Sequence, residues 1–292
     1  MSYNKQTSEK YGWDPSWFGA DDFGPELQEK VKLFQKSMGI GADGLVGPAT
    51  FRRIFAHREA TIDDYEPNGE HIVYNGNYFP IKWDKVITWG EPGGLKLNSN
   101  TYSSYSGKPP RDITMFVNHW DVCLSSKSCV SVLNKRKVSV HFCIDNDGTI
   151  YQTMDTRDVA WHAGSKKLNE CTIGVEISCA YDLKYQSWYV KNGFGERPII
   201  EDAYVHGRKL DPFLGFYPVQ LQALRALWGA IHKATGIPLQ CPSFHGSTST
   251  HVEDSARNGN YRGFVSHYHL TERKIDCAGL DIDHQLKLLG ES

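Results

Sequence analysis

Between residues 113 and 269, short apolar runs of strand length alternate with segments of helical periodicity. The pattern predicts strands at 113–119, 139–145, 148–154, 172–178 and 263–269, and helices at 125–135 and 218–235. The longest helix has Pro218 at its first position and Gly236 just after its end, which are standard start and stop signals. We therefore expect the α/β class: a mixed central sheet flanked by helices, preceded by a small all-α helical bundle.

The first sixty residues have the pattern of a separate helical unit. Pro25 and Pro48 each stand where a helix can begin, because the missing N–H of proline costs nothing in the first turn. Apolar residues then follow at spacings of three and four, which predicts helices over about 24–38 and 48–58. The Gly-rich stretch 38–47 is the expected turn between them.

The chain thus divides into three predicted parts. They are a helical module at 1–60, a linker with an accessory hairpin at 61–110, and the α/β domain at 111–292. In the linker, residues 70–89 alternate apolar and polar positions around an Asn-Gly pair at 75–76, which predicts a tight hairpin turn. Two polar segments, 181–214 and 239–262, are longer than usual loops, and we expect them to form walls of a binding site.

Composition excludes several classes of function. The formal net charge is −2, and no basic stripe of the kind that nucleic acids or anionic membranes require is visible. No apolar run approaches the roughly 18 residues of a membrane span, and the first residues lack the apolar core of a secretory signal. Seven cysteines, an odd number, favour reduced thiols in a cytosolic protein.

Five motifs in chain order carry a family resemblance. They are Phe116-Val-Asn-His-Trp120, Val140-His-Phe-Cys-Ile-Asp-Asn-Asp-Gly-Thr-Ile-Tyr-Gln152, Ala160-Trp-His-Ala-Gly164, Thr172-Ile-Gly-Val-Glu-Ile177, and His267 with Cys277-Ala-Gly279. Together they resemble the type 2 N-acetylmuramoyl-L-alanine amidases, which include phage lysozyme-type amidases and peptidoglycan-recognition proteins. The helical module resembles the peptidoglycan-binding domain of cell-wall hydrolases, through Phe34-Gln35, Asp43-Gly44, Gly47 and Thr50.

The resemblance implies a catalytic zinc ion held by His119, His267 and Cys277. Two imidazoles and a thiolate suit Zn²⁺, and three protein ligands leave a fourth position for water. Glu176 is then the proton carrier. A charged residue in an otherwise apolar strand is costly to bury, so its presence there indicates a polar role. Lys274 is the candidate for stabilising the developing oxyanion.

Two ligand positions stay open at this stage. His269 also precedes Cys277, and strand alternation would place it on the same face as His267. Asp276 competes with Cys277, because some members of the family use an aspartate there. We prefer His267 and Cys277, and we assign His269 to substrate binding.

Three further residues are predicted to bind substrate: His141, Trp161 and His162. The function implied is hydrolysis of the amide between N-acetylmuramic acid and L-alanine, with bacterial peptidoglycan as the partner. The wall-binding module and the absence of a signal peptide favour a phage endolysin that stays in the host cytoplasm until lysis. The alternatives are a cytosolic amidase that recycles muropeptides and a non-catalytic peptidoglycan receptor.

Overall fold

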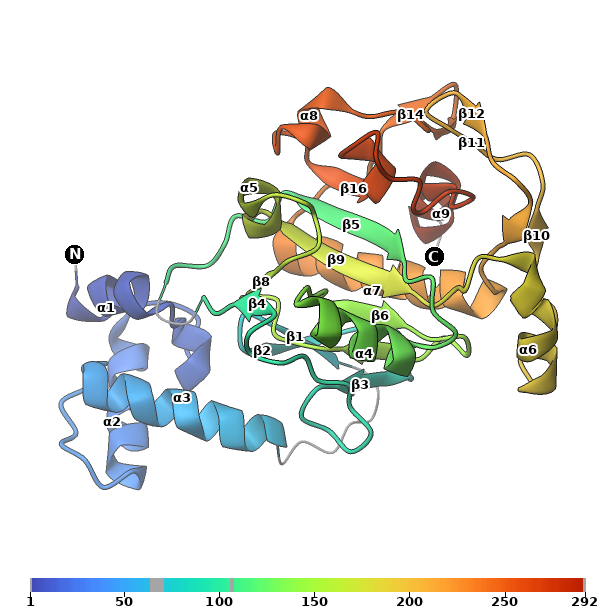
Figure 1. Cartoon of the computed structure of the whole chain (residues 1–292). Helices are drawn as coiled ribbons and strands as arrows, with labels where there is room; N and C mark the ends of the chain where they lie inside the picture. Colours follow the sequence, from blue (N-terminus) through green and yellow to red (C-terminus); the bar gives the residue numbers. More distant parts are fainter. Residues whose placement is uncertain (1, 64–70, 106–107, 291–292) are drawn as a thin grey trace.

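A six-stranded mixed sheet forms the centre of the computed structural model, which describes residues 2–63, 71–105 and 108–290 (Figure 1). In their order across the sheet the strands are β16 (Gly263–Ser266), β5 (Met115–Trp120), β9 (Thr172–Ile177), β6 (Phe142–Ile144), β7 (Ile150–Gln152) and β3 (Val86–Thr88). Neighbours run parallel except for β6 and β7, which pair antiparallel. The predicted mixed sheet is confirmed.

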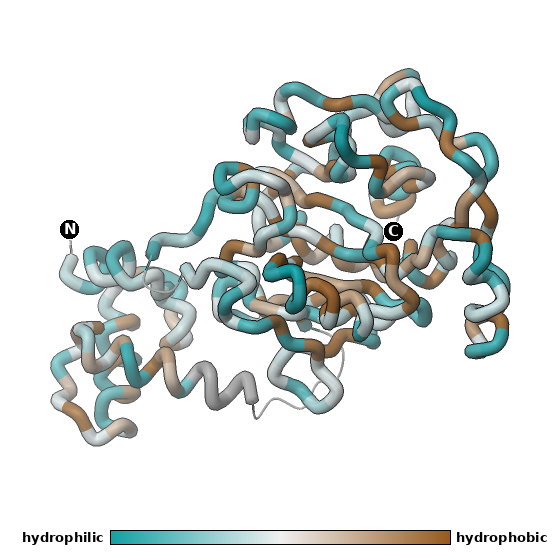
Figure 2. Tube along the Cα trace, viewed as in Figure 1, coloured by the Kyte–Doolittle hydropathy of each residue, from teal (hydrophilic) through white to brown (hydrophobic). Residues whose placement is uncertain are grey.

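Helices cover both faces of this sheet. The face that includes Phe116, Val175 and Phe264 packs against α7 (Pro218–Thr235), which contributes Leu224 and Trp228 to the same apolar cluster. The opposite face packs against α4 (Ser126–Arg136) and α5 (Lys166–Glu170). In Figure 2 the most apolar stretches follow the central strands and the segments that cover them.

The predicted helices at 24–38, 125–135 and 218–235 agree with the structure within one residue at each end, and the one predicted at 48–58 extends to residue 63. Several short helices were not predicted, and the last helix of the described residues is among them. This is α9 (Ile282–Gly290), whose Ile282 and Leu286 join the cluster under α7. The last predicted strand is shorter than expected, because β16 ends at Ser266 and a 3₁₀ turn, η3 (His267–His269), follows it.

The two long polar segments contain short elements of their own. They hold η2 (Leu183–Tyr185), α6 (Gln186–Lys191), β10 (Ile199–Ile200), β11 (Tyr204–Val205), β12 (Arg208–Lys209), β13 (Phe213–Leu214), β14 (Ser243–Phe244), β15 (Ser247–Thr248) and α8 (Asp254–Arg257). The short strands pair as β10 with β13, β11 with β12 and β14 with β15. Another small pair, β4 (Tyr102–Ser103) with β8 (Val159–Ala160), leads into the segment that carries Trp161.

The N-terminal helices are α1 (Tyr3–Tyr11), η1 (Pro15–Phe18), α2 (Pro25–Ser37) and α3 (Pro48–Asp63). They enclose an apolar cluster that includes Trp13, Leu27 and Ile54. The buried Gln35 amide donates to the Asp43 carboxylate at 2.8 Å and to the Thr50 hydroxyl at 3.0 Å. This network ties α2 to the turn before α3.

The predicted tight turn at 75–76 is confirmed, but the hairpin spans residues 71–80 of the predicted 70–89, and residues 86–88 form β3 of the central sheet. β1 (His71–Tyr74) pairs antiparallel with β2 (Asn77–Pro80), and Asn75 and Gly76 have the positive φ angles of the turn. The side chain of Gln152 in β7 accepts from the Val73 N–H and donates to the Val73 carbonyl, both at 2.7 Å. The hairpin is therefore attached to the central sheet.

The helical module contacts the rest of the chain at a few points. The guanidinium of Arg157 lies 4.8 Å from the centre of the Phe55 ring, and Gly76 lies beside the indole of Trp17. Gly12 packs against the Lys108 backbone. Among the described residues, no helix has the length and apolar character needed to cross a membrane.

Candidate active site

The register of two parallel strands brings His119 and Glu176 together. β5 and β9 pair so that His119 stands directly opposite Glu176. Successive side chains of a strand point to opposite faces, so Val175 and Ile177 enter the core beneath α7 while Glu176 points to the other face. His119 and Glu176 line the same pocket there.

His119, His267 and Asp276 form one buried group. The Nδ1 atom of His119 lies 3.0 Å from Nδ1 of His267 and 3.0 Å from Oδ2 of Asp276. The Nδ1 atom of His267 lies 3.1 Å from the same carboxylate oxygen. Three potential ligand atoms thus converge on one point, an arrangement that can hold a metal ion.

The backbone around residue 267 explains this convergence. β16 runs parallel to β5 with Ser266 opposite Asn118, so the next residue of each strand, His267 and His119, come to the same end of the sheet. The N–H of Tyr268 donates to the carbonyl of Asp276 at 3.0 Å. This bond holds the loop that contains Asp276 beside the 3₁₀ turn at 267–269. The Asp276 carboxylate therefore lies between the two imidazoles.

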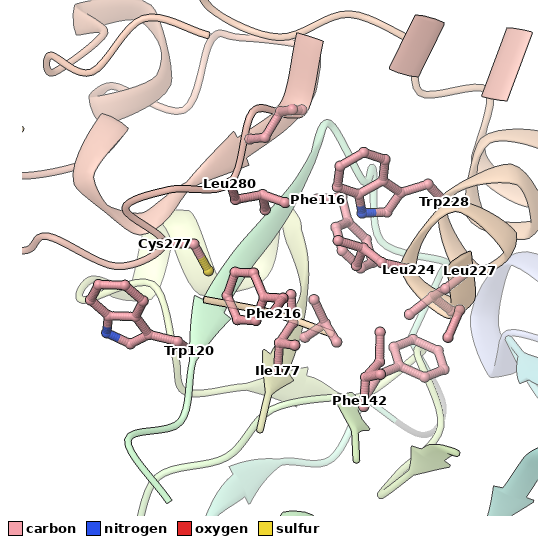
Figure 3. Packing of buried hydrophobic residues seen from close by; sticks show 14 of the residues in the cluster. Phe116, Trp120, Phe142, Ile177, Phe216, Leu224, Leu227, Trp228, Cys277 and Leu280 are labelled. Atoms are coloured by element: carbon pink, nitrogen blue, oxygen red, sulfur yellow. The ribbon is translucent and has the colours of Figure 1, made fainter. Parts of the chain in front are cut away.

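Cys277, which was predicted to complete the ligand set, does not lie with the two histidines in the structure. Its side chain is fully buried in the apolar cluster under α7, and Figure 3 draws it in the same cluster as Trp120, Phe216 and Leu280. Burial raises the pKa of the thiol well above its usual value. The preceding residue, Asp276, points to the pocket instead.

His269 is also placed differently from its prediction as a substrate-binding residue. It is fully buried, its Nδ1 accepts from the Ser266 N–H at 2.9 Å, and its Nε2 donates to the Ser249 carbonyl at 2.7 Å. The alternation argument failed because residues 267–269 form a 3₁₀ turn and not a strand. Of the two competing histidines, the structure places His267 in the group.

Glu176 is half-buried in the wall of the pocket beside this group. Its Oε2 atom is inaccessible and has no hydrogen-bond partner among the described residues. Burial raises the pKa of Glu176 well above its usual value, and the nearby Asp121 and Asp276 carboxylates raise it further. A carboxyl group whose pKa is raised can serve as a proton donor as well as a proton acceptor.

The pocket extends along the surface on both sides of the group. Trp161 and Lys274 line it together with His119 and Glu176. A second pocket shares Trp161 and Lys274 with the first and continues to Arg273. An aromatic ring and cationic side chains along one continuous channel suit a ligand that carries sugar and carboxylate groups.

The profiles of two known families match parts of the chain. The sequence profile of the N-acetylmuramoyl-L-alanine amidase family matches residues 109–276, which is more than half of the chain. The chain belongs to this amidase family. A profile described as a putative peptidoglycan binding domain matches residues 9–54. No curated protein sequence matches the chain.

Several solved amidase structures are similar to the chain. The amidase AmiD from E. coli, in complex with anhydro-N-acetylmuramic acid-L-Ala-D-gamma-Glu-L-Lys, has 22% identity over 51% of this chain and 52% of that one, with a TM-score of 0.32. LysC from Clostridium intestinale URNW has 14% identity over 70% and 97%, with a TM-score of 0.39. AmpDh3 from Pseudomonas aeruginosa, in complex with anhydromuramic pentapeptide, has 18% identity over 67% and 66%, with a TM-score of 0.40.

His141 was predicted to bind substrate, but in the structure it lies in the protein core and not in the pocket. It is fully buried, and its Nδ1 accepts from the Gly174 N–H at 3.2 Å. Its Nε2 therefore carries the proton and donates to the Asp158 carbonyl at 3.1 Å. Burial lowers the pKa of His141 to about 3, and the neighbouring Arg111 guanidinium adds to the effect.

Trp161 and His162, which were predicted to bind substrate, both line the pocket. The indole N–H of Trp161 donates to the Ser103 hydroxyl at 3.1 Å, which leaves its ring face beside the pocket. Both ring nitrogens of His162 are engaged within the protein, with His119 at 3.0 Å and with Thr172 at 3.1 Å. Thr172 was not singled out from the sequence. The Gly at 174, in an otherwise apolar strand, was the available signal of a close approach by another side chain.

Proposed function

We propose that this chain is a zinc-dependent N-acetylmuramoyl-L-alanine amidase that cleaves the bond between N-acetylmuramic acid and the L-alanine of the stem peptide. The observation that carries the proposal is the convergence of His119, His267 and Asp276 beside Glu176. Imidazole nitrogens and a carboxylate oxygen are ligand types that Zn²⁺ accepts, and three protein ligands are usual for a catalytic zinc site. The donor set therefore fits the ion.

An amide carbonyl is a poor electrophile, so hydrolysis of this bond requires a catalyst. When bound, a zinc ion supplies Lewis-acid polarisation of the scissile carbonyl and of the attacking water. Glu176 accepts the proton of that water at its carboxylate and then donates it to the nitrogen of the leaving L-alanine. Its raised pKa suits the second half of this task, in which it acts as an acid.

Two other pocket residues act on the substrate in this proposal. The ammonium group of Lys274 faces the same pocket as Glu176 and stabilises the negative charge that develops on the carbonyl oxygen. The ring of Trp161 offers an apolar surface for a sugar or a peptide side chain.

The helical module supports the role of a phage endolysin. A peptidoglycan-binding module joined to an amidase keeps the enzyme on an insoluble polymer, where tethering raises the effective concentration of substrate. A recycling amidase acts on small soluble fragments and gains nothing from such a module. As an endolysin, the protein would remain in the host cytoplasm until lysis gives it access to the wall.

Analysis of the digestion products tests the proposal. We expect purified peptidoglycan treated with the full chain to release new N-terminal alanine, without new reducing sugar ends. The matched control is Glu176→Gln, which keeps the size of the side chain and should release neither. New reducing ends would mean glycosidase activity, and binding of the wall without any cleavage would mean a receptor.

A further inference from the structure

A chain of hydrogen bonds leads from the backbone of α5 to the metal-binding group. The Thr172 hydroxyl donates to the Leu168 carbonyl at 2.8 Å. The same oxygen lies 3.1 Å from Nε2 of His162, and Nδ1 of His162 lies 3.0 Å from Nε2 of His119. The other nitrogen of the His119 ring, Nδ1, is the one that faces His267 and Asp276.

The first link sets the direction of every other link. A threonine hydroxyl has one hydrogen, and here the Leu168 carbonyl takes it. The Thr172 oxygen can therefore only accept from His162, so Nε2 of His162 carries a proton. A neutral imidazole with its proton on Nε2 has a lone pair on Nδ1, and this is the atom that faces His119.

The acceptor on His162 then fixes the proton of His119. The proton must lie on Nε2 of His119, because that atom faces the Nδ1 lone pair of His162. The opposite nitrogen, Nδ1, keeps its lone pair and presents it to the group. This is the tautomer that a metal ligand needs at that atom.

Strand β9 leaves space for the His162 ring at Gly174. A Cβ atom on Gly174 would lie 2.6 Å from both Cε1 and Nδ1 of His162, closer than real contacts allow. Gly174 is in a buried strand where glycine costs stability relative to a β-branched residue. The ring of His162 thus lies over a gap that only glycine provides, two residues from Glu176.

We propose that His162 is a positioning residue, held by Thr172 over Gly174, that locks His119 in the tautomer required for metal binding. The inference rests on the proposed zinc site. It adds residues that orient a metal ligand without binding the metal themselves. It also replaces the predicted contact of His162 with substrate, since both ring nitrogens are already engaged. Loss of the lock should weaken the affinity for zinc without removing a ligand.

Two matched pairs of full-length variants test this lock. Thr172→Val has nearly the shape of threonine but no hydroxyl, whereas Thr172→Ser keeps the hydroxyl. His162→Leu removes the acceptor, whereas His162→Asn keeps an acceptor near the position of Nδ1. The readout is the zinc dissociation constant, measured by competition with a chelator, and circular dichroism of the metal-free proteins reports whether each variant folds.

We expect His162→Leu to bind zinc about 10 to 100 times more weakly than the natural chain, the usual range for such outer residues. Thr172→Val should show a smaller loss in the same direction, and Thr172→Ser and His162→Asn should stay close to the natural affinity. If His162→Leu fails to fold, the zinc affinities of Thr172→Val and Thr172→Ser test the inference in its place.

A second readout follows the tautomer itself. Long-range proton–nitrogen NMR spectra of the metal-free protein should show His119 protonated at Nε2, and Thr172→Val should populate the Nδ1–H form. Unchanged zinc affinity in both Thr172→Val and His162→Leu would overturn the inference and leave the zinc site intact. A natural chain that binds no zinc would overturn the proposed metal centre together with the lock.

Discussion

At the residue scale, the division of work between metal ligands and proton carrier can be tested at Glu176. The carboxyl lies in the pocket beside the group but is not one of its three ligand atoms. We predict that Glu176→Gln keeps its zinc and loses about two to four orders of magnitude in rate, the range for a positioned acid–base group. Metal analysis and turnover of a soluble muropeptide measure the two properties separately.

Loss of zinc in Glu176→Gln would instead place the carboxylate among the ligands. Near-normal turnover would assign proton transfer to another group. Glu170→Gln is a suitable matched control, because Glu170 lies in α5 outside the pocket and its carboxylate lies 3.9 Å from the Lys166 ammonium.

His141 gives a prediction about stability and pH. Its folded pKa of about 3 lies below the ordinary value of about 6.5, so the unfolded chain binds a proton that the folded chain excludes. The neutral ring's contribution to stability is present above about pH 6.5 and is lost as the pH falls towards 3. The loss amounts to at most about 1.4 kcal/mol per pH unit.

His141→Asn, which keeps an acceptor for the Gly174 N–H, should remove this dependence. We expect denaturant unfolding to show a smaller fall in stability for the variant than for the natural chain between pH 6.5 and 5. Equal slopes for the two proteins would mean that His141 is protonated in the folded state.

At the scale of elements, the 3₁₀ turn after β16 separates the roles of two histidines that are two residues apart. His267 faces the pocket, while His269 bonds the backbone at Ser249 and Ser266. We predict that His269→Ala keeps its zinc but is destabilised by about 1–3 kcal/mol for each buried group left unpaired. Thermal unfolding and metal analysis of one preparation measure both effects.

Zinc loss from folded His269→Ala would contradict this separation. His206→Ala is the matched control, because His206 contacts the carbonyl of Lys274 from an exposed position. It should change neither zinc content nor stability by much.

Strand positions were predictable here because the strands are short apolar runs, and Glu176 was identified as the charged residue in the run 172–177. The choice between Asp276 and Cys277 as the third ligand was not predictable from the sequence. It depends on how the loop at 276–277 packs against η3, which decides which of the two side chains faces the pocket. The helix α9 was readable from the spacing of Ile282 and Leu286 and was overlooked. The short pairs in the long loops depend on distant contacts that a local pattern does not contain.

At the scale of the whole molecule, the helical module touches the rest of the chain through few side chains, such as Phe55 and Arg157. We predict that deletion of residues 1–60 leaves cleavage of soluble muropeptides nearly unchanged. Activity on insoluble wall at low enzyme concentration should fall by about 100-fold or more, because tethering is lost. Turnover on both substrates and sedimentation with purified wall measure the effect.

Equal loss of activity on both substrates would give the module a structural role. Circular dichroism of the truncated chain provides the control, since an unfolded catalytic part would also lose both activities.

The central claim of this account is that Asp276, and not the adjacent Cys277, completes the metal site. Zinc content per chain, measured for the natural protein, Asp276→Ala and Cys277→Ala, tests it most directly. Both substitutions keep the backbone carbonyl and N–H groups that hold the loop. We predict about one zinc per chain in the natural protein and in Cys277→Ala, and loss of most zinc in folded Asp276→Ala. Retention of zinc by Asp276→Ala together with its loss from folded Cys277→Ala would contradict the account.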